Sequence, residues 1–400
     1  MTTQAATGTF RAQPIGWAPF GRHTRYMLVR YLTNVAMVTA VLLAIALTID
    51  LWPQFDTIFV SGGGGFGGAW AVMRFCALRS PWLVAPFLSF ATFLGVFWTE
   101  MTLTLSGERM LIWNSGRSPL QCLAPVILLG LILGAGEFAL DAYLGPAAMA
   151  VQMQERLGLD GERLDRARLS EPSWIALPNG LLRTRIAYGP PPELRDLIYF
   201  RHNAAGRLTE VEMAAVARLQ PGGNTWVMHD GRFWKAGGGA ANAGTAIASS
   251  HEAMIPFATR NVTLDIAPLW LSMFGMEPQY VPFGVLKRLA EADHDPESLA
   301  RYKTRLNVLD GETVLPGAMA LLAASLSMLM LAYATTMRAL VTIAFVGYMA
   351  HFATKACLLM GQTGTMPAVL AGWIVPGILV AASVLLLVLA RGRQRPITGA

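Results

Sequence analysis

Charged side chains within or beside long apolar stretches are the residues of this sequence best placed to take part in chemistry. His351 and Lys355 stand one helical turn apart, so a helix would present both on one face. Ionisable groups at membrane depth are costly and usually face a cavity or a partner, which favours a role in binding substrate. Lys355 also lies near the end of its apolar stretch, and its ammonium group could simply extend to the membrane surface.

Two arginines, Arg74 and Arg79, precede a second apolar stretch at the depth expected for lipid phosphates. Guanidinium groups bind phosphate through paired hydrogen bonds, so both residues are candidates for substrate contact, with anchoring at the membrane interface as the alternative. Glu137 and Asp141 are one turn apart in a third stretch. We expect these two carboxylates to form ion pairs, with Lys355 or Arg79, rather than to contact lipid.

No catalytic residue, metal site or cofactor is expected. The glycine-rich segments 61–68 and 237–246 lack the Lys-Ser or Lys-Thr that completes a phosphate-binding loop. We expect the first to be a flexible loop between helices and the second a loop between strands. The cysteines lie in or beside apolar stretches without metal-ligand spacing (Cys76, Cys122 and Cys357). If ATP powers this protein, another chain must bind it.

Six apolar stretches, in two groups of three, must position these charges. The sequence is 54% hydrophobic and only 14% charged, which excludes an ordinary soluble protein. Each stretch has roughly the 20 residues that a helix needs to cross the hydrocarbon layer. They occupy residues 26–52, 82–105, 120–140, 314–333, 340–359 and 369–390.

Between the two groups lies a polar insert of short apolar runs separated by Gly, Pro and Asn. This pattern predicts an all-β, jellyroll-like domain. A helix over 282–292 and another that begins at Pro296, with Asp295 as its cap, follow it. The predicted fold class is an α-helical membrane protein with six transmembrane helices and an inserted extracytoplasmic β domain. Its expected parts are a tail (1–25), three spans (26–144), the β domain with connecting helices (145–313), three spans (314–391) and a tail (392–400).

Basic residues predict the orientation, because Lys and Arg concentrate in cytoplasmic loops. Four groups of arginines fall on one side of the membrane: before the first stretch, between the second and third, between the fourth and fifth, and after the sixth. Both termini are therefore predicted to be cytoplasmic and the insert extracytoplasmic. The net charge of +6 (31 basic minus 25 acidic residues) reflects this bias and does not indicate a nucleic-acid partner.

Reporter fusions test this orientation. A fusion at Gly206, in the insert, should be active only outside the cytoplasm, and a fusion at Ser115 only inside it, because the arginine bias separates these two positions. Alkaline phosphatase and a fluorescent protein serve as the paired reporters. Cytoplasmic activity of the Gly206 fusion would contradict the whole architecture.

Several motifs resemble the LptF/LptG (YjgP/YjgQ) family of lipopolysaccharide export permeases. Residues 107–119 are similar to its cytoplasmic segment, in which an acidic residue opens a short helix. Trp174 and residues 223–228 are similar to its strand landmarks, and residues 361–376 resemble its last turn and span. The resemblance extends from about Arg25 to Leu389, and the Gly-x-x-Gly-x-x-Pro turn at 361–367 favours LptG over LptF. Two features depart from the family: a single basic residue, Arg338, between the fourth and fifth stretches, and Ile-Asp-Leu-Trp at 49–52 where lysines are common.

The resemblance implies a permease subunit of an ABC-type exporter, which extracts lipopolysaccharide from the bacterial inner membrane and passes it to a periplasmic bridge. The implied partners are an LptB-type ATPase dimer, a paired LptF- or LptG-type permease, an LptC-type single-span protein and an LptA-type bridge. Glu108 would anchor the ATPase-docking segment with Arg109, Trp113 and Gly116. The alternative for Glu108 is a solvated surface charge.

Two other classes of protein remain open at this point. A membrane-anchored periplasmic receptor would need a cytoplasmic signalling domain, and the predicted cytoplasmic parts are short. A secondary transporter would show paired broken helices and clustered charges at the membrane midplane. The six stretches show neither clearly. Copurification with an ATPase would favour the permease over both.

Overall fold

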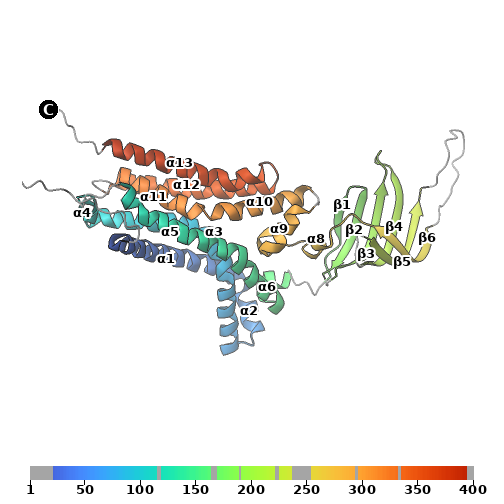
Figure 1. Cartoon of the computed structure of the whole chain (residues 1–400). Helices are drawn as coiled ribbons and strands as arrows, with labels where there is room; N and C mark the ends of the chain where they lie inside the picture. The colour runs from blue at the N-terminus through green and yellow to red at the C-terminus, as the bar shows by residue number, and fades with distance from the viewer. Residues whose placement is uncertain are drawn as a thin grey trace, which may run out of the picture.

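The computed structural model describes residues 21–114, 119–163, 169–188, 191–220, 225–236, 254–292, 296–331 and 335–393. Five helical stretches in this part of the chain are long and apolar enough to cross a membrane: α1 (Arg22–Leu51), α3 (Gly65–Leu105), α5 (Pro119–Ala139) with its extension, α12 (Met337–Gln362) and α13 (Ala368–Arg393). A sixth span is present if α10 (Pro296–Glu312) and α11 (Leu315–Met330), which meet at a 48° bend, count as one. The β domain projects from one end of this bundle (Figure 1).

Glycines bring the helices of the bundle close together. A Cβ added at Gly130 of α5 would lie 2.4 Å from the Cα of Gly317 in α11, and one at Gly372 of α13 would lie 2.2 Å from the carbonyl oxygen of Asn307 in α10. Small residues at such crossings allow the backbone contact that drives helix association in lipid. These crossings hold α11 against α5 and α13 against α10.

Helix α3 does not begin where the second apolar stretch begins. The glycine-rich sequence predicts a flexible loop over 61–68, but the structure has η1 (Trp52–Gln54), α2 (Phe55–Ser61) and a tight turn directly into α3. Gly63 and Gly64 have φ values of 84° and 67°, the left-handed region that favours glycine. An added Cβ at Gly68 would lie 2.5 Å from the carbonyl oxygen of Phe59. These glycines therefore allow a close helical hairpin, which points away from the bundle (Figure 1).

The chain continues without a break from α5 towards the β domain. Helix α5 passes through a π-helical segment, η2 (Leu140–Leu144), into α6 (Gly145–Glu155), and α7 (Gly158–Arg163) follows. Single π-helical turns within α-helices occur frequently at functional sites. Asp141 lies inside this turn.

The insert forms one antiparallel sheet of six strands paired in chain order: β1 (Ser173–Leu177), β2 (Gly180–Ala187), β3 (Glu193–His202), β4 (Leu208–Leu219), β5 (Thr225–Lys235) and β6 (Ile255–Thr263). The alternating apolar side chains of β2 to β5 are buried on one face, where Leu182, Tyr199 and Trp226 belong to the core. The same hydrophobic cluster includes residues of α8 (Pro268–Ser272), η3 (Pro278–Tyr280) and α9 (Phe283–Glu291) and reaches Ala142 and Met149 at the end of the bundle. The predicted fold class, a membrane helix bundle with an inserted β domain, is confirmed.

Candidate docking and lipid-facing sites

The short helix α4 (Glu108–Asn114) contains the residues predicted to dock an ATPase. The Glu108 carboxylate accepts a hydrogen bond from Arg30 Nη1 at 2.7 Å and one from the Tyr26 hydroxyl at 3.3 Å, both on α1. Desolvation, the largest single influence, raises the pKa of Glu108, but the hydrogen bond and charge of Arg30 together lower it below the ordinary value. Glu108 is therefore a partly exposed carboxylate that pairs with Arg30 of α1.

Arg109 lies inside the protein, with only 4% of its surface exposed. Its Nη2 donates to Oε2 of Glu100 at 2.6 Å and to the Glu100 carbonyl oxygen at 2.8 Å, while Nε donates to Thr104 Oγ1 at 2.7 Å. The buried Glu100 also accepts a hydrogen bond from the Tyr31 hydroxyl. Arg109 thus fastens α4 to α3 and, through Glu100, to α1, and it offers little surface to another protein.

The exposed face of α4 is apolar. Leu111 is 71% exposed and Met110 is also exposed, whereas Ile112 packs against the bundle core. Exposed apolar patches flanked by charge are typical of protein contact surfaces. The side chain of Trp113, and Gly116 as a whole, lie outside the described residues.

Arg79, predicted to contact a lipid phosphate, is buried between two carboxylates. Its guanidinium group donates to both oxygens of Asp50, at 2.9 and 3.0 Å, and lies 2.9 Å from Asp160 of α7. The Trp82 ring lies 4.3 Å from the Arg79 Cζ atom. Two carboxylates around one guanidinium give this cluster a net negative charge. Arg79 therefore links α1, α3 and α7 and does not present a free cation to a lipid.

A pocket of about 600 Å³ opens beside Arg79 between α1 and α3. Most of its lining is apolar, and one end carries Asp50, Arg79 and Asp160. An apolar lining with a few convergent polar groups is typical of small-molecule binding sites. The apolar lining consists of Leu42, Ile45, Ala46, Ile49, Pro53, Leu83, Phe87 and Leu159.

The other three predicted residues also have neighbours within the chain. Arg74 forms an ion pair with Glu155 at 2.5 Å. His351 lies near two aromatic rings of α3, with centroid distances of 5.2 Å to Phe90 and 6.2 Å to Phe87. Lys355, on the same face of α12, interacts electrostatically with carboxylates instead.

Those carboxylates form the buried charge cluster, which consists of Glu137, Asp141, Arg305, Glu312 and Lys355. Asp141 is 2.7 Å from Arg305 Nη2 and shares a hydrogen bond with the Glu312 side chain. The Ser89 hydroxyl lies within hydrogen-bonding distance of both carboxylate oxygens of Glu137, at 2.7 and 2.9 Å. Three acidic and two basic side chains, contributed by α5, η2, α10 and α12, therefore meet where the bundle joins the β domain.

The sequence did not point to Arg305 or Glu100. Arg305 belongs to a helix that reads as part of the polar insert, and only the bend between α10 and α11 brings it beside Asp141. Glu100 is a lone acid near the end of the second apolar stretch. An unpaired carboxylate at membrane depth is costly in free energy, so Glu100 needs a basic partner. Arg109, nine residues further along the sequence, was the nearest candidate for that ion pair.

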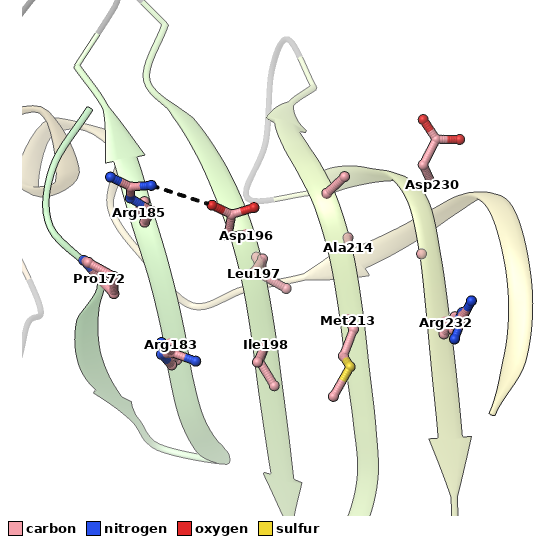
Figure 2. A pocket seen from close by; sticks show the side chains of 12 residues that line it. Pro172, Arg183, Arg185, Asp196, Leu197, Ile198, Met213, Ala214, Asp230 and Arg232 are labelled. Atoms are coloured by element: carbon pink, nitrogen blue, oxygen red, sulfur yellow. Dashed lines mark ion pairs between the residues drawn. The ribbon is translucent and has the colours of Figure 1, made fainter. Parts of the chain in front are cut away.

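A second pocket, of about 560 Å³, lies on the face of the sheet opposite the core. Figure 2 shows its lining, with Arg183 and Arg185 on β2 and Arg232 on β5. Asp196 lies 3.8 Å from Arg185 and, like Asp230 at the same pocket, has a positive φ. Three guanidinium groups and two carboxylates leave a small positive balance on this open surface.

A protein-family model matches most of the chain. The family model described as lipopolysaccharide export system permease LptF/LptG matches residues 25–389. A search of curated proteins finds none that matches. The matched region includes α4, the pocket beside Arg79, the buried charge cluster and the whole β domain.

Proposed function

Because the chain belongs to the LptF/LptG family of lipopolysaccharide export permeases, we propose that it extracts lipopolysaccharide from the bacterial inner membrane as one half of a paired permease. The lipid then passes to a periplasmic bridge. Two described features support this proposal: an apolar pocket with a polar end on the membrane surface of α1 and α3, and an apolar docking helix at the opposite end of the bundle. Both termini face the cytoplasm and the sheet faces the periplasm in this proposal.

A separate ATPase supplies the energy. Moving an acyl chain out of the bilayer costs about 0.8 kcal/mol per CH₂ group, so a lipid with several chains does not leave spontaneously. An LptB-type ATPase dimer would press on α4, and the buried pair Arg109–Glu100 would carry this motion to α3 and, through the hydrogen bond from Tyr31 to Glu100, to α1. The second permease chain would close the other side of the lipid site. An LptC-type protein and an LptA-type bridge would receive the lipid.

Glu108 provides the direct test of docking. We expect Glu108→Gln to lower recovery of the ATPase with the permease about tenfold, because a partly exposed carboxylate that pairs with an ATPase cation contributes about 1–2 kcal/mol. Copurification from membranes and ATP hydrolysis by the purified complex are the measurements. The purified permease alone should hydrolyse no ATP.

Arg30→Gln is the matched control, because it removes the intramolecular partner of Glu108 and leaves the carboxylate in place. Recovery should then stay near that of the wild type. If both variants lose the ATPase equally, Glu108 acts by orienting α4 and does not contact the partner. If neither variant changes recovery, the docking role of Glu108 is wrong.

A further inference from the structure

The hairpin formed by α2 and residues 65–80 of α3, here called the lateral hairpin, is not needed to cross the membrane. Helix α3 has 41 residues, which corresponds to roughly 60 Å, about twice the hydrocarbon thickness. Pro81 and Pro86 lie inside it, and prolines in a helix interior cause kinks. The part before these prolines runs across the bundle axis together with α2, at the end of the bundle nearest the sheet (Figure 1).

One face of the lateral hairpin carries an exposed apolar stripe. Phe66 is 90% exposed, and Trp70 and Met73 are each 55% exposed. With Ala77, these residues recur at intervals of four, three and four, so they fall within about 60° of one another around the helix. The opposite face of the same helix holds the buried residues Gly68, Phe75 and Arg79.

The buried face keeps the lateral hairpin attached to the rest of the protein. Phe75 packs so closely on the chain at Gly158 that an added Cβ there would lie 2.7 Å from the Phe75 ring. Arg74, at the edge of the stripe, pairs with Glu155 of α6. The helix that carries the stripe is therefore packed against the rest of the protein through its opposite face, and the stripe faces outward.

The surface of the lateral hairpin is too apolar to be stable in contact with water. Between residues 52 and 78 the sequence has two charged residues, Asp56 and Arg74, whereas a helix in water needs a charged or polar outer face. Ile49 near the end of α1 and Trp52 in η1 are also exposed, so apolar surface is present where α1 leads into the hairpin. Tryptophan and phenylalanine are typical residues of helices that lie in a membrane interface.

We propose that the lateral hairpin lies flat in the periplasmic leaflet, with Phe66, Trp70 and Met73 seated among the acyl chains. The lipid of the membrane that the bundle crosses therefore covers the exposed apolar stripe. Because η1 leads into the hairpin and also lines the pocket beside Arg79, the hairpin sets the depth of the charged end of this pocket relative to the headgroups. This proposal does not depend on an ATPase or on lipopolysaccharide as substrate.

Spin labels in nanodiscs test the proposal. The full chain with Cys76→Ser, Cys122→Ser and Cys357→Ser would carry one new cysteine, Phe66→Cys or Trp70→Cys, in phosphatidylethanolamine and phosphatidylglycerol nanodiscs. Both labels should show several-fold greater relaxation by oxygen than by a water-soluble nickel chelate. Asp56→Cys, the polar control on α2, should show the reverse. Greater relaxation by nickel at position 66 would overturn the proposal, and protection from both reagents would indicate a protein partner and overturn it as well.

A second measurement uses the unmodified protein, so it does not rely on the cysteine substitutions. Photolysis of a phospholipid with a diazirine in its acyl chain should label peptides that contain residues 60–77, as mapped by mass spectrometry. The peptide of β4, an inner strand of the sheet, serves as the internal control and should stay unlabelled. Absence of lipid adducts from 60–77, with labelling of α1 and α13 in the same sample, would contradict insertion.

Discussion

Replacing Arg305 by leucine is expected to destabilise the helix bundle by about 3–5 kcal/mol, the usual cost of removing one partner from a buried ion pair. Arg305 is 7% exposed and lies 2.7 Å from Asp141, which is also largely buried. Without it, Lys355 is the one remaining cation of the buried charge cluster and faces three acidic groups. The free energy of unfolding in detergent, from chemical denaturation monitored by circular dichroism, measures the loss.

Two further variants separate charge from packing. Arg305→Lys keeps the charge but loses the planar group, so we expect a loss of about 1–2 kcal/mol. The double variant Arg305→Leu with Asp141→Leu removes both partners and should recover much of the stability of the wild type, because apolar pairs replace buried ion pairs at little cost. If Arg305→Leu alone stays within about 1 kcal/mol of the wild type, water reaches the cluster and the burial argument fails.

Disconnecting α4 by Arg109→Leu is the change expected to affect transport most. Glu100 would keep its carboxylate at 3% exposure with the Tyr31 hydroxyl as its remaining described partner, and breaking such a pair costs about 3–5 kcal/mol. We expect the ATPase to remain bound through the exposed face of α4, while ATP hydrolysis no longer drives lipid release. The ratio of lipid extracted to ATP hydrolysed, in reconstituted vesicles, should fall at least tenfold.

This outcome differs in kind from that of Glu108→Gln, which should reduce binding of the ATPase and leave the transport ratio of the surviving complexes unchanged. Glu100→Gln keeps a hydrogen-bonding partner for Arg109 and should show an intermediate ratio. Limited proteolysis within 108–114 gives an independent readout, since α4 should become more susceptible only when its anchor to α3 is lost. Normal transport by Arg109→Leu would show that α1 and α3 follow the ATPase without this ion pair.

The sequence predicted the membrane helices and most of the strands because both follow from the local spacing of apolar residues. One of the short apolar runs of the insert, residues 208–219, is β4, and the helix predicted over 282–292 matches α9 to within one residue at each end. The family was also predicted from short motifs in the right order, and the match over residues 25–389 confirms it. Local pattern did not predict the lateral hairpin, since four consecutive glycines read as a flexible loop and not as a close helix turn.

Only the tertiary structure decided which charges meet. His351 and Lys355 do share one face of α12, as their spacing predicts, yet one lies near aromatic rings and the other faces carboxylates. Arg79 pairs with Asp50 and Asp160, and Asp141 pairs with Arg305. Periodicity indicates the side of a helix on which a charge lies. It carries no information about the distant helix packed there, and at membrane depth it is that packing which determines the partner of each charge.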